Sequence, residues 1–404
     1  MAPPSSESDQ ETAPGAYFEG YFTWSRFGPF SVAHQYLFFA LYIPIGCCLL
    51  LLRTVALLLL LVVAILSSFC CEHGQRDDED VEAGRRIRHS NRGCSVHSLV
   101  VQLSRHLFIS RVQVSHDDGD STRTRGAHQH HAPILVSNHV SEEDYVAIAS
   151  QFSARVVAMD YIEKVPVIGR LMRVTDPIYI GQIGNKQSKS GGLSSPKSVE
   201  AYKAAQRDKV AAAVAASQRV AASRGDEAPS VLLFPEGVLL HGDPTRPQEA
   251  MLRYQKFIFG LGLPVQPLAI RRHVGSLQRA LCPVAWDTVS ASLLDNVFWF
   301  LFLPRCEYTI RVLPQMARLP DESNMDFADR VQAATADALG LVASRWGNRD
   351  KNACIREARK RRKRRQQQKK TTIEPLNMST VQPNKPAPRP RDVELSPSNG
   401  LLSA

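Results

Sequence analysis

Residue types that could perform general-base chemistry gather at Asn138-His139 and Asp144, directly after the apolar run Ile134–Val136. An apolar run followed by Ser-Asn and acidic residues predicts a buried strand, a turn and the start of a helix. A strand end fixes an imidazole in space, and a carboxylate about one helical turn later can set its tautomer. The alternative is a loop histidine followed by an acidic residue that favours the first helical turn.

A second candidate is Glu236-Gly237, which follows the short apolar run Val231–Phe234 and Pro235. The elements around the two candidates alternate: strands are expected at 108–114, 155–159, 177–181, 231–234, 263–270 and 307–313, and helices at 99–107, 145–152, 165–174, 198–222, 251–259 and 327–342. This alternation predicts an α/β domain with a mainly parallel sheet flanked by helices. Sites in such sheets lie beyond the carboxyl ends of the strands, where both candidates are expected.

The composition allows one large domain with appendages. The chain has 404 residues, 44% of them hydrophobic, and a formal net charge of +10. That length fits one domain of about 200 to 250 residues plus terminal segments. The expected organisation is a disordered start (1–16), an aromatic belt and membrane anchor (17–72), a charged linker (73–98), a catalytic-type domain (99–318), a closing helix (319–346) and a basic disordered tail (347–404).

The segment Tyr36–Cys71 is almost wholly apolar and predicts a membrane anchor. One straight span needs about 20 residues, so the segment is too long for one and slightly short for two. A re-entrant hairpin bent at Pro44-Ile45-Gly46 fits best, with Arg53 snorkelling or lining the turn and both ends on the cytosolic side. A single kinked span is the alternative.

The basic run Arg359–Arg365 supplies much of the excess charge and suits an anionic lipid surface. A nuclear or nucleic-acid role is not expected, because the anchor should hold the chain at membranes. The eight cysteines form no CxxC pattern or disulfide framework, which indicates a reducing environment. The three histidines at 128, 130 and 131 have no matched carboxylate or cysteine pattern, so no metal site is expected.

Three motifs in order resemble the glycerolipid acyltransferase family: Asn-His at 138–139 with Asp144, FPEG at 234–237 and PVQP at 264–267. Further sequences, including YIPIGCCLLLLR and DFADRVQAATADALG, resemble a lipid-droplet branch of that family. The branch carries a ubiquitin-binding CUE domain, for which the polar tail has no recognisable counterpart. An aromatic cluster at 298–302 is expected either in the core or in a membrane or acyl-chain contact.

The resemblance implies that His139 is the general base that activates an acceptor hydroxyl for attack on an acyl-CoA thioester, and that Asp144 orients it. It also implies that Asn138, Glu236, Gly237 and Lys256 contribute to substrate binding. Acyl-CoA is then a co-substrate, and no cofactor or metal is needed. Two departures from the family pattern, at 182 and 238–240, remove phosphate-side contacts. Arg253, Lys256, Arg271 or Arg272 are candidates to replace them.

These expectations favour a membrane-anchored acyltransferase that acts on a lysophospholipid or related glycerolipid at the endoplasmic reticulum or a lipid droplet, with a cytosolic domain. The alternative is a non-catalytic adaptor on the same fold, connected to ubiquitin-conjugation machinery and to degradation at the endoplasmic reticulum. The missing phosphate-side residues and the lipid-droplet resemblance motivate that alternative.

Overall fold

The computed structural model describes residues 32–73, 98–117, 132–141, 143–165, 168–181, 196–224, 228–237, 250–273, 298, 301–354 and short helical pieces between 356 and 368. The chain divides into two units, Met1–Ile355 and Arg356–Ala404. All labelled helices and strands belong to the first unit. The expected disordered start, aromatic belt, histidine-rich insertion, Gln182 and Val238–Leu240 lie outside the described residues, as does most of the charged linker.

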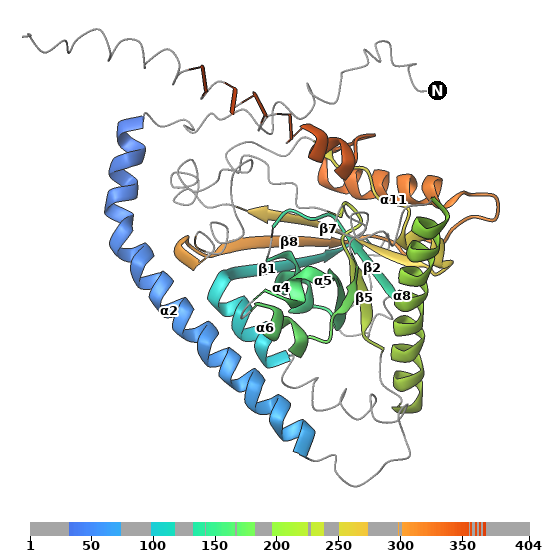
Figure 1. The fold of residues 1–404 in the computed structure, drawn as a ribbon, viewed down its shortest axis with the longest axis horizontal. Helices are drawn as coiled ribbons and strands as arrows, with labels where there is room; N and C mark the ends of the chain where they lie inside the picture. The colour runs from blue at the N-terminus through green and yellow to red at the C-terminus, as the bar shows by residue number, and fades with distance from the viewer. Residues whose placement is uncertain are drawn as a thin grey trace, which may run out of the picture. The chain divides into compact units, whose positions relative to one another are not determined.

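A seven-stranded sheet organises the first unit, in the order β1-β8-β7-β2-β5-β3-β4 (Figure 1). Its strands are β1 (Ile109–His116), β2 (Ile134–Ser137), β3 (Ala154–Met159), β4 (Ile178–Ile180), β5 (Ser230–Leu233), β7 (Val265–His273) and β8 (Cys306–Val312). Every pairing is parallel except that of β7 with β8. The predicted mainly parallel sheet is therefore confirmed.

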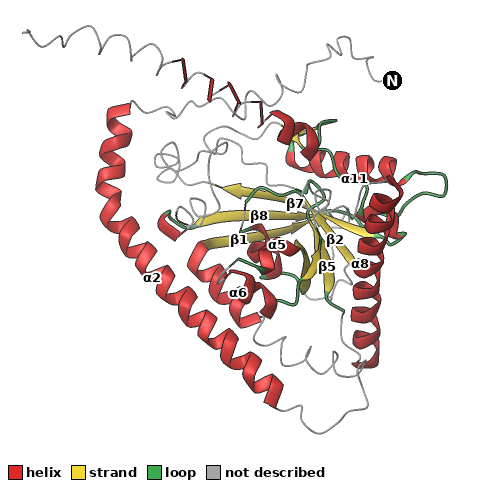
Figure 2. Cartoon of the chain, in the orientation of Figure 1, coloured by secondary structure: helices red, strands yellow, loops and turns green. Residues whose placement is uncertain are grey.

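The central strands β2 and β5 are buried along their whole length, as expected for strands covered on both faces. Ile134 and Val136 enter one core, together with residues of α8 (Pro196–Arg224) and α11 (Asn324–Leu339). Leu135 enters the other core with residues of α4 (Asp144–Ala149). Helices thus cover both faces of the sheet (Figure 2). The shorter elements are α5 (Asp160–Glu163), α6 (Ile168–Val174), η1 (Ile258–Leu261) and the strand pair β6 (Ala250–Met251) and β9 (Val342–Ala343).

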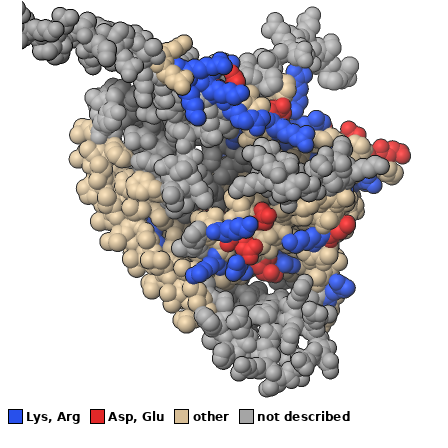
Figure 3. Space-filling model, in the orientation of Figure 1, with Lys and Arg blue, Asp and Glu red and all other residues tan. Residues whose placement is uncertain are grey.

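The hydrophobic segment forms one continuous helix, α2 (Val32–His73), with Pro44 inside it. The predicted hairpin with a bend at Pro44–Gly46 is therefore wrong. A bend would leave several backbone groups unpaired in an apolar segment, whereas a proline within a helix removes one hydrogen bond. Within α2, Phe39–Val63 is long and apolar enough to cross a membrane. Figure 3 shows few charged side chains along α2, in contrast to the rest of the described surface.

One face of α2 is docked against the domain. Arg53 is buried and donates to the carbonyl oxygens of Leu301 at 2.9 Å and Leu303 at 2.5 Å. Its guanidinium also lies 5.3 Å from the centroid of the Phe108 ring. The expected snorkelling of Arg53 does not occur, because backbone carbonyl groups of the domain satisfy its charge.

The aromatic cluster supplies the rest of this contact. Phe302 is buried, and its ring meets Tyr42 edge-on with centroids 5.4 Å apart. Gly46 faces the Phe302 ring so closely that an added Cβ would overlap it. Phe298 is 43% exposed and stacks on Phe302 at 5.5 Å. The described part of the cluster therefore joins the domain to α2.

Two expected elements differ in the structure. The helix predicted over 251–259 is instead the end of β6, an extended stretch and the 3-10 helix η1. Backbone groups there pair with distant segments, for example Gln255 N with Pro235 O at 2.9 Å, so tertiary contacts replace helical ones. The tail expected to be disordered from 347 begins with a helix at 348–354, in which Lys351 is buried.

Candidate active site

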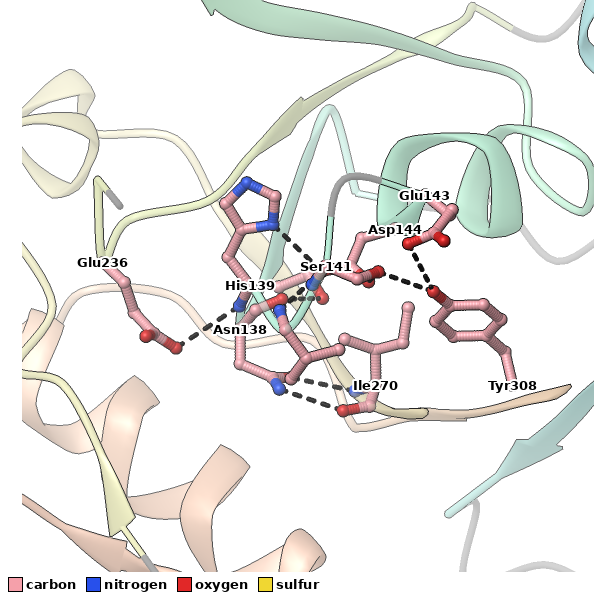
Figure 4. Close-up of polar contacts among 10 residues, drawn as sticks. Asn138, His139, Ser141, Glu143, Asp144, Glu236, Ile270 and Tyr308 are labelled. Atoms are coloured by element: carbon pink, nitrogen blue, oxygen red, sulfur yellow. Dashed lines mark hydrogen bonds and ion pairs between the residues drawn. The ribbon is translucent and has the colours of Figure 1, made fainter. Parts of the chain in front are cut away.

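The register of the sheet brings the two leading motifs together. β2 pairs in parallel with β5, and Val136 lies opposite Leu233. His139 and Glu236 each follow three residues later, so both leave the same edge of the sheet. The backbone N–H of His139 donates to Oε1 of Glu236 at 3.4 Å (Figure 4). The expectation that both lie beyond neighbouring strand ends is confirmed.

The side chain of Asn138 pairs with the backbone of β7. Its amide nitrogen donates to the carbonyl oxygen of Ile270 at 2.9 Å, and its amide oxygen accepts from the N–H of Ile270 at 2.9 Å. The side chain is fully buried. Both ends of the amide therefore fasten the loop after β2 to β7, and the expectation that Asn138 contributes to substrate binding stays a prediction.

The third motif also has a structural role. The PVQP residues 264–267 enter β7, where Val265 and Pro267 lie opposite Ile134 and Val136 of β2. The side chain of Gln266 donates to the carbonyl oxygen of Leu313. This motif therefore supports the strand that carries His139 at its end.

His139 and Asp144 form the predicted pair, with Nδ1 of the imidazole 2.9 Å from Oδ2 of the carboxylate. Asp144 is fully buried at the start of α4. Its Oδ2 also accepts from the N–H groups of Val140 at 2.6 Å and Ser141 at 2.9 Å, and its Oδ1 accepts from Oγ of Ser141 at 2.6 Å. These donors hold the carboxylate in one orientation.

This geometry selects one tautomer of His139. A carboxylate that already accepts from two N–H groups acts toward the ring as an acceptor, so Nδ1 carries the proton. Nε2 then holds the free lone pair and lies on the side of the ring away from Asp144 (Figure 4). The ring stacks on Phe234 with centroids 4.1 Å apart, and the side chain is 21% exposed. The imidazole is thus fixed on one side and accessible on the other.

A polar network behind Asp144 was not found from the sequence. The hydroxyl groups of Ser141 and Tyr308 are 2.5 Å apart, and Tyr308 donates to Oε2 of Glu143 at 3.3 Å (Figure 4). Arg272 lies 3.5 Å from Oε1 of the same Glu143. In the sequence, Ser141 is recognisable only as a polar residue just before the acidic residues. Tyr308 and Arg272 come from β8 and β7, and no local pattern connects them to Asp144.

Glu236 is a carboxyl group in a fully buried position. Burial raises the pKa of Glu236 from 4.5 to about 8, while the N–H of His139 and the charge of Lys351 act in the opposite direction. Its Oε2 has no hydrogen-bond partner among the described residues. A buried polar atom without a partner is costly, so this oxygen is a candidate to pair with a ligand.

In the loop after β5, position 237 has no room for a side chain. Its φ angle is +68°, a region that other residues rarely adopt, and an added Cβ would overlap the amide of Gln255. Gln255 in turn donates to the carbonyl oxygen of Glu236 at 3.3 Å. The side chain of Gln255 therefore occupies the space beside Gly237, and a contribution of Gly237 to substrate binding stays a prediction.

The segment after α11 reaches the same loop. Asn348 donates to the carbonyl oxygen of Gly237 at 3.2 Å. Lys351 is 7% exposed, and burial lowers the pKa of Lys351 from 10.5 to about 8 while the charge of Glu236 raises it. Sequence analysis missed both residues because they lie in a stretch whose composition predicts disorder.

Three of the four predicted phosphate-side cations make contacts within the protein. Arg253 makes an ion pair with Asp329 at 2.5 Å, Arg272 pairs with Glu143, and Arg271 donates to the carbonyl oxygen of Leu339. Lys256 is exposed, and its charge acts on Glu200 of α8. These contacts hold Arg253, Arg271 and Arg272 within the protein, and substrate binding by Lys256 stays a prediction. Within the described part of the chain, no group of three side chains suits a metal ion.

A protein-family model and several known proteins resemble parts of this chain. A protein-family model described as Acyltransferase matches residues 118–271, which include His139, Asp144 and Glu236. The Xenopus laevis protein named lipid droplet-regulating VLDL assembly factor AUP1 is 36% identical over 129 residues, which are 32% of this chain and 29% of that protein. Human lysophospholipid acyltransferase LPCAT4 is 27% identical over 256 residues, 61% of this chain and 41% of that protein. The chain thus spans less than half the length of either relative.

A solved structure also resembles this chain. It is the 1-acyl-sn-glycerophosphate (LPA) acyltransferase PlsC from Thermotoga maritima, with a TM-score of 0.39 and 13% sequence identity. The alignment covers 73% of this chain and 95% of that one.

Proposed function

We propose that the chain is a membrane-anchored acyltransferase; the match of residues 118–271 to the Acyltransferase family model and the similarity to an AUP1 protein support this proposal. It moves an acyl group from acyl-CoA to a hydroxyl of a lysophospholipid or related glycerolipid. The observation that carries this proposal is the His139–Asp144 pair at 2.9 Å, with Glu236 beside it at the same edge of the sheet.

In the proposed reaction Nε2 of His139 takes the proton of the acceptor hydroxyl as that oxygen attacks the thioester carbonyl carbon. A carbon–oxygen bond forms, the carbon–sulfur bond breaks, and the protonated imidazole returns the proton to the departing CoA thiolate. Asp144 stabilises the positive charge that His139 carries between the two transfers. No covalent acyl-enzyme is required.

Glu236 is the group proposed to hold the acceptor. Its Oε2 has no partner among the described residues and can pair with a substrate hydroxyl. The φ of +68° at Gly237 turns the chain so that the loop closes on this carboxyl group. Asn138 contributes indirectly, because it fastens the loop of His139 to β7.

The proposed place of action is the surface of the endoplasmic reticulum or of a lipid droplet. The apolar helix α2 supports membrane attachment, and two relatives are named for lipid-droplet regulation and lysophospholipid acylation. We place the catalytic domain on the cytosolic side. The basic run Arg359–Arg365 is proposed as an accessory contact with anionic lipid.

The test is acyl transfer from labelled acyl-CoA to a panel of lysolipids, comparing the native protein with His139→Ala. Loss of a general base typically costs about 10²- to 10⁴-fold in turnover. His273→Ala is the matched control, because His273 pairs with Thr309 on the exposed end of β7. Equal turnover by the native protein and His139→Ala would remove His139 from catalysis.

A second candidate function is a non-catalytic adaptor at lipid droplets or the endoplasmic reticulum, connected to ubiquitin-conjugation machinery. The observation that favours it is the engagement of Arg253, Arg271 and Arg272 within the protein, away from Glu236. The same lysolipid panel separates the two candidates. No acylation by the native protein, together with recovery of a ubiquitin-conjugating enzyme in a pull-down, would select the adaptor.

A further inference from the structure

We propose that Tyr308 is a positioning residue for His139, and that it acts through a chain of two buried hydroxyl groups that ends on Asp144. This inference rests on the proposed function and adds a residue from β8 to the same site. Three observations carry it: the lengths of the hydrogen bonds in the chain, the number of protons available to them, and the strand that holds Tyr308.

The direction of the chain follows from counting protons. Oδ1 of Asp144 accepts from Oγ of Ser141 at 2.6 Å. An ionised carboxylate can only accept, so Ser141 gives its one hydroxyl proton to Asp144. The hydroxyl of Tyr308 lies 2.5 Å from Oγ of Ser141 (Figure 4). Since the proton of Ser141 is already used, Tyr308 is the donor in this second bond.

Glu143 is the other acceptor near the hydroxyl of Tyr308. Its Oε2 is 3.3 Å away, whereas Oγ of Ser141 is 2.5 Å away, so Glu143 receives the weaker part of a three-centre hydrogen bond. Arg272 lies 3.5 Å from Oε1 of Glu143, and these two side chains are 11% and 5% exposed. Because a cation holds Glu143, the proton of Tyr308 remains directed to Ser141.

Two neighbouring strands hold the site from behind. Tyr308 of β8 is buried and lies opposite Arg272 of β7 in the antiparallel register, so both side chains project from the same face of the sheet. Two residues before Arg272, the backbone of Ile270 pairs with Asn138. β7 thus fixes the loop immediately before His139, and β8 fixes the carboxylate that orients its ring.

The hydroxyl chain matters most when His139 carries a positive charge. In the proposed reaction the protonated imidazole depends on a carboxylate held at one distance and in one orientation. Hydrogen bonds in a buried chain polarise one another, so the bond from Tyr308 strengthens the bond from Ser141 to Asp144. Loss of the Tyr308 hydroxyl should therefore lower turnover without weakening the binding of the acceptor.

The first test is a double-mutant cycle on acyl transfer, with the lysolipid that the native protein acylates best. Tyr308→Phe should lower kcat by about 2- to 10-fold, the usual range for one neutral hydrogen bond, and leave KM within about two-fold. Ser141→Ala should lower kcat by about 10- to 100-fold, because its bond is to a charged group. The double variant should lose no more than Ser141→Ala alone. Losses that multiply would overturn the chain.

Tyr42→Phe is the matched control. Tyr42 is buried, and its hydroxyl donates to the carbonyl oxygen of Phe302 at 2.8 Å, so this variant also removes one buried tyrosine hydrogen bond. It should lower the melting temperature in detergent and leave kcat unchanged below the unfolding transition. A loss of kcat as large as that of Tyr308→Phe would reduce the role of Tyr308 to stability alone.

A second readout needs no turnover. The Nδ1 proton of His139 is followed by NMR in protein labelled with ¹⁵N-histidine, and His139→Gln identifies its signal. Its exchange with water should be about 2- to 10-fold faster in Tyr308→Phe and unchanged in Tyr42→Phe. Equal exchange in the native protein and Tyr308→Phe, or no protected Nδ1 proton in the native protein, overturns the inference. If no lysolipid is acylated, faster exchange in Tyr308→Phe supports the positioning role while the proposed function fails.

Discussion

Two buried carboxyl groups, those of Asp144 and Glu236, lie beside His139 and differ in the hydrogen bonds that they accept. Asp144 accepts from Nδ1 of His139, from two backbone N–H groups and from the hydroxyl of Ser141. Glu236 accepts from the N–H of His139 at 3.4 Å, and its Oε2 has no partner among the described residues. The first arrangement orients a base, whereas the second leaves an oxygen for a ligand.

The raised pKa of Glu236 predicts how stability depends on pH. The pKa moves from 4.5 to about 8 on folding, so between these values the folded state binds more protons than the unfolded state. The free energy of unfolding should therefore fall as the pH rises through this window, by about 1.4 kcal/mol per pKa unit at most. Glu236→Gln should flatten the decline of the melting temperature between pH 5 and 8, measured in detergent.

Glu200→Gln is the control for that measurement, because Glu200 is exposed on α8 and should leave the slope unchanged. Lys351 should act in the opposite sense at higher pH. Its pKa falls from 10.5 to about 8, so its contribution to stability should recover as the pH rises from 8 to 10.5. Identical pH slopes for the native protein and Glu236→Gln would show that Glu236 is ionised in the folded state.

Among the elements, α2 differs most from its prediction, because it is one continuous helix and not a hairpin. It is docked on the domain, where Arg53 donates to the carbonyl oxygens of Leu301 and Leu303 and Tyr42 donates to that of Phe302 at 2.8 Å. Gly46 lies between these contacts and against the Phe302 ring. Membrane helix and catalytic-type domain are therefore expected to move as one body.

Gly46→Ala tests this docking, because the expected change in stability is opposite in sign to the change that helix propensity alone predicts. Alanine stabilises a free helix by about 1 kcal/mol relative to glycine. Here its Cβ would overlap the buried Phe302 ring, and overpacking typically costs about 1 to 3 kcal/mol. The melting temperature in detergent should therefore fall, and hydrogen exchange at residues 301–303 should become faster. Cys47→Ala on the exposed neighbouring position should change neither, and a more stable Gly46→Ala would argue against the docking.

At the scale of the whole molecule, the exposed face of α2 is the expected membrane contact. Leu51, Leu52, Leu58 and Leu59 are all between 48% and 68% exposed. Burying one leucine side chain contributes about 1.5 to 3 kcal/mol, so replacing these four by serine should move a large part of the protein from vesicles into solution. Flotation with phospholipid vesicles measures this.

Removal of the second unit, residues 356–404, is the comparison for that experiment. It takes away the basic run Arg359–Arg365, whose contact with anionic lipid is proposed to be accessory. Vesicle binding should therefore persist. Loss of binding on this deletion, with the leucine variant still bound, would exchange the roles of the two segments.

The features that could be predicted from the sequence are those whose causes are local. His139 and Asp144 are five residues apart, so a strand end and one helical turn are enough to join them. The strand runs before His139 and Glu236 are apolar throughout because their strands are buried on both faces, and parallel pairing then takes both to one edge.

The features that could not be predicted are those that depend on partners far away in the sequence. Tyr308 meets Ser141 across 167 residues, and Arg53 meets Leu303 across 250, so no window of sequence contains both sides of either contact. The stretch at 251–255 is not helical because its backbone pairs with distant segments. Lys351 comes from a stretch with the composition of a disordered tail, and its burial beside Glu236 arises because α11 and β9 carry the chain back to the FPEG loop.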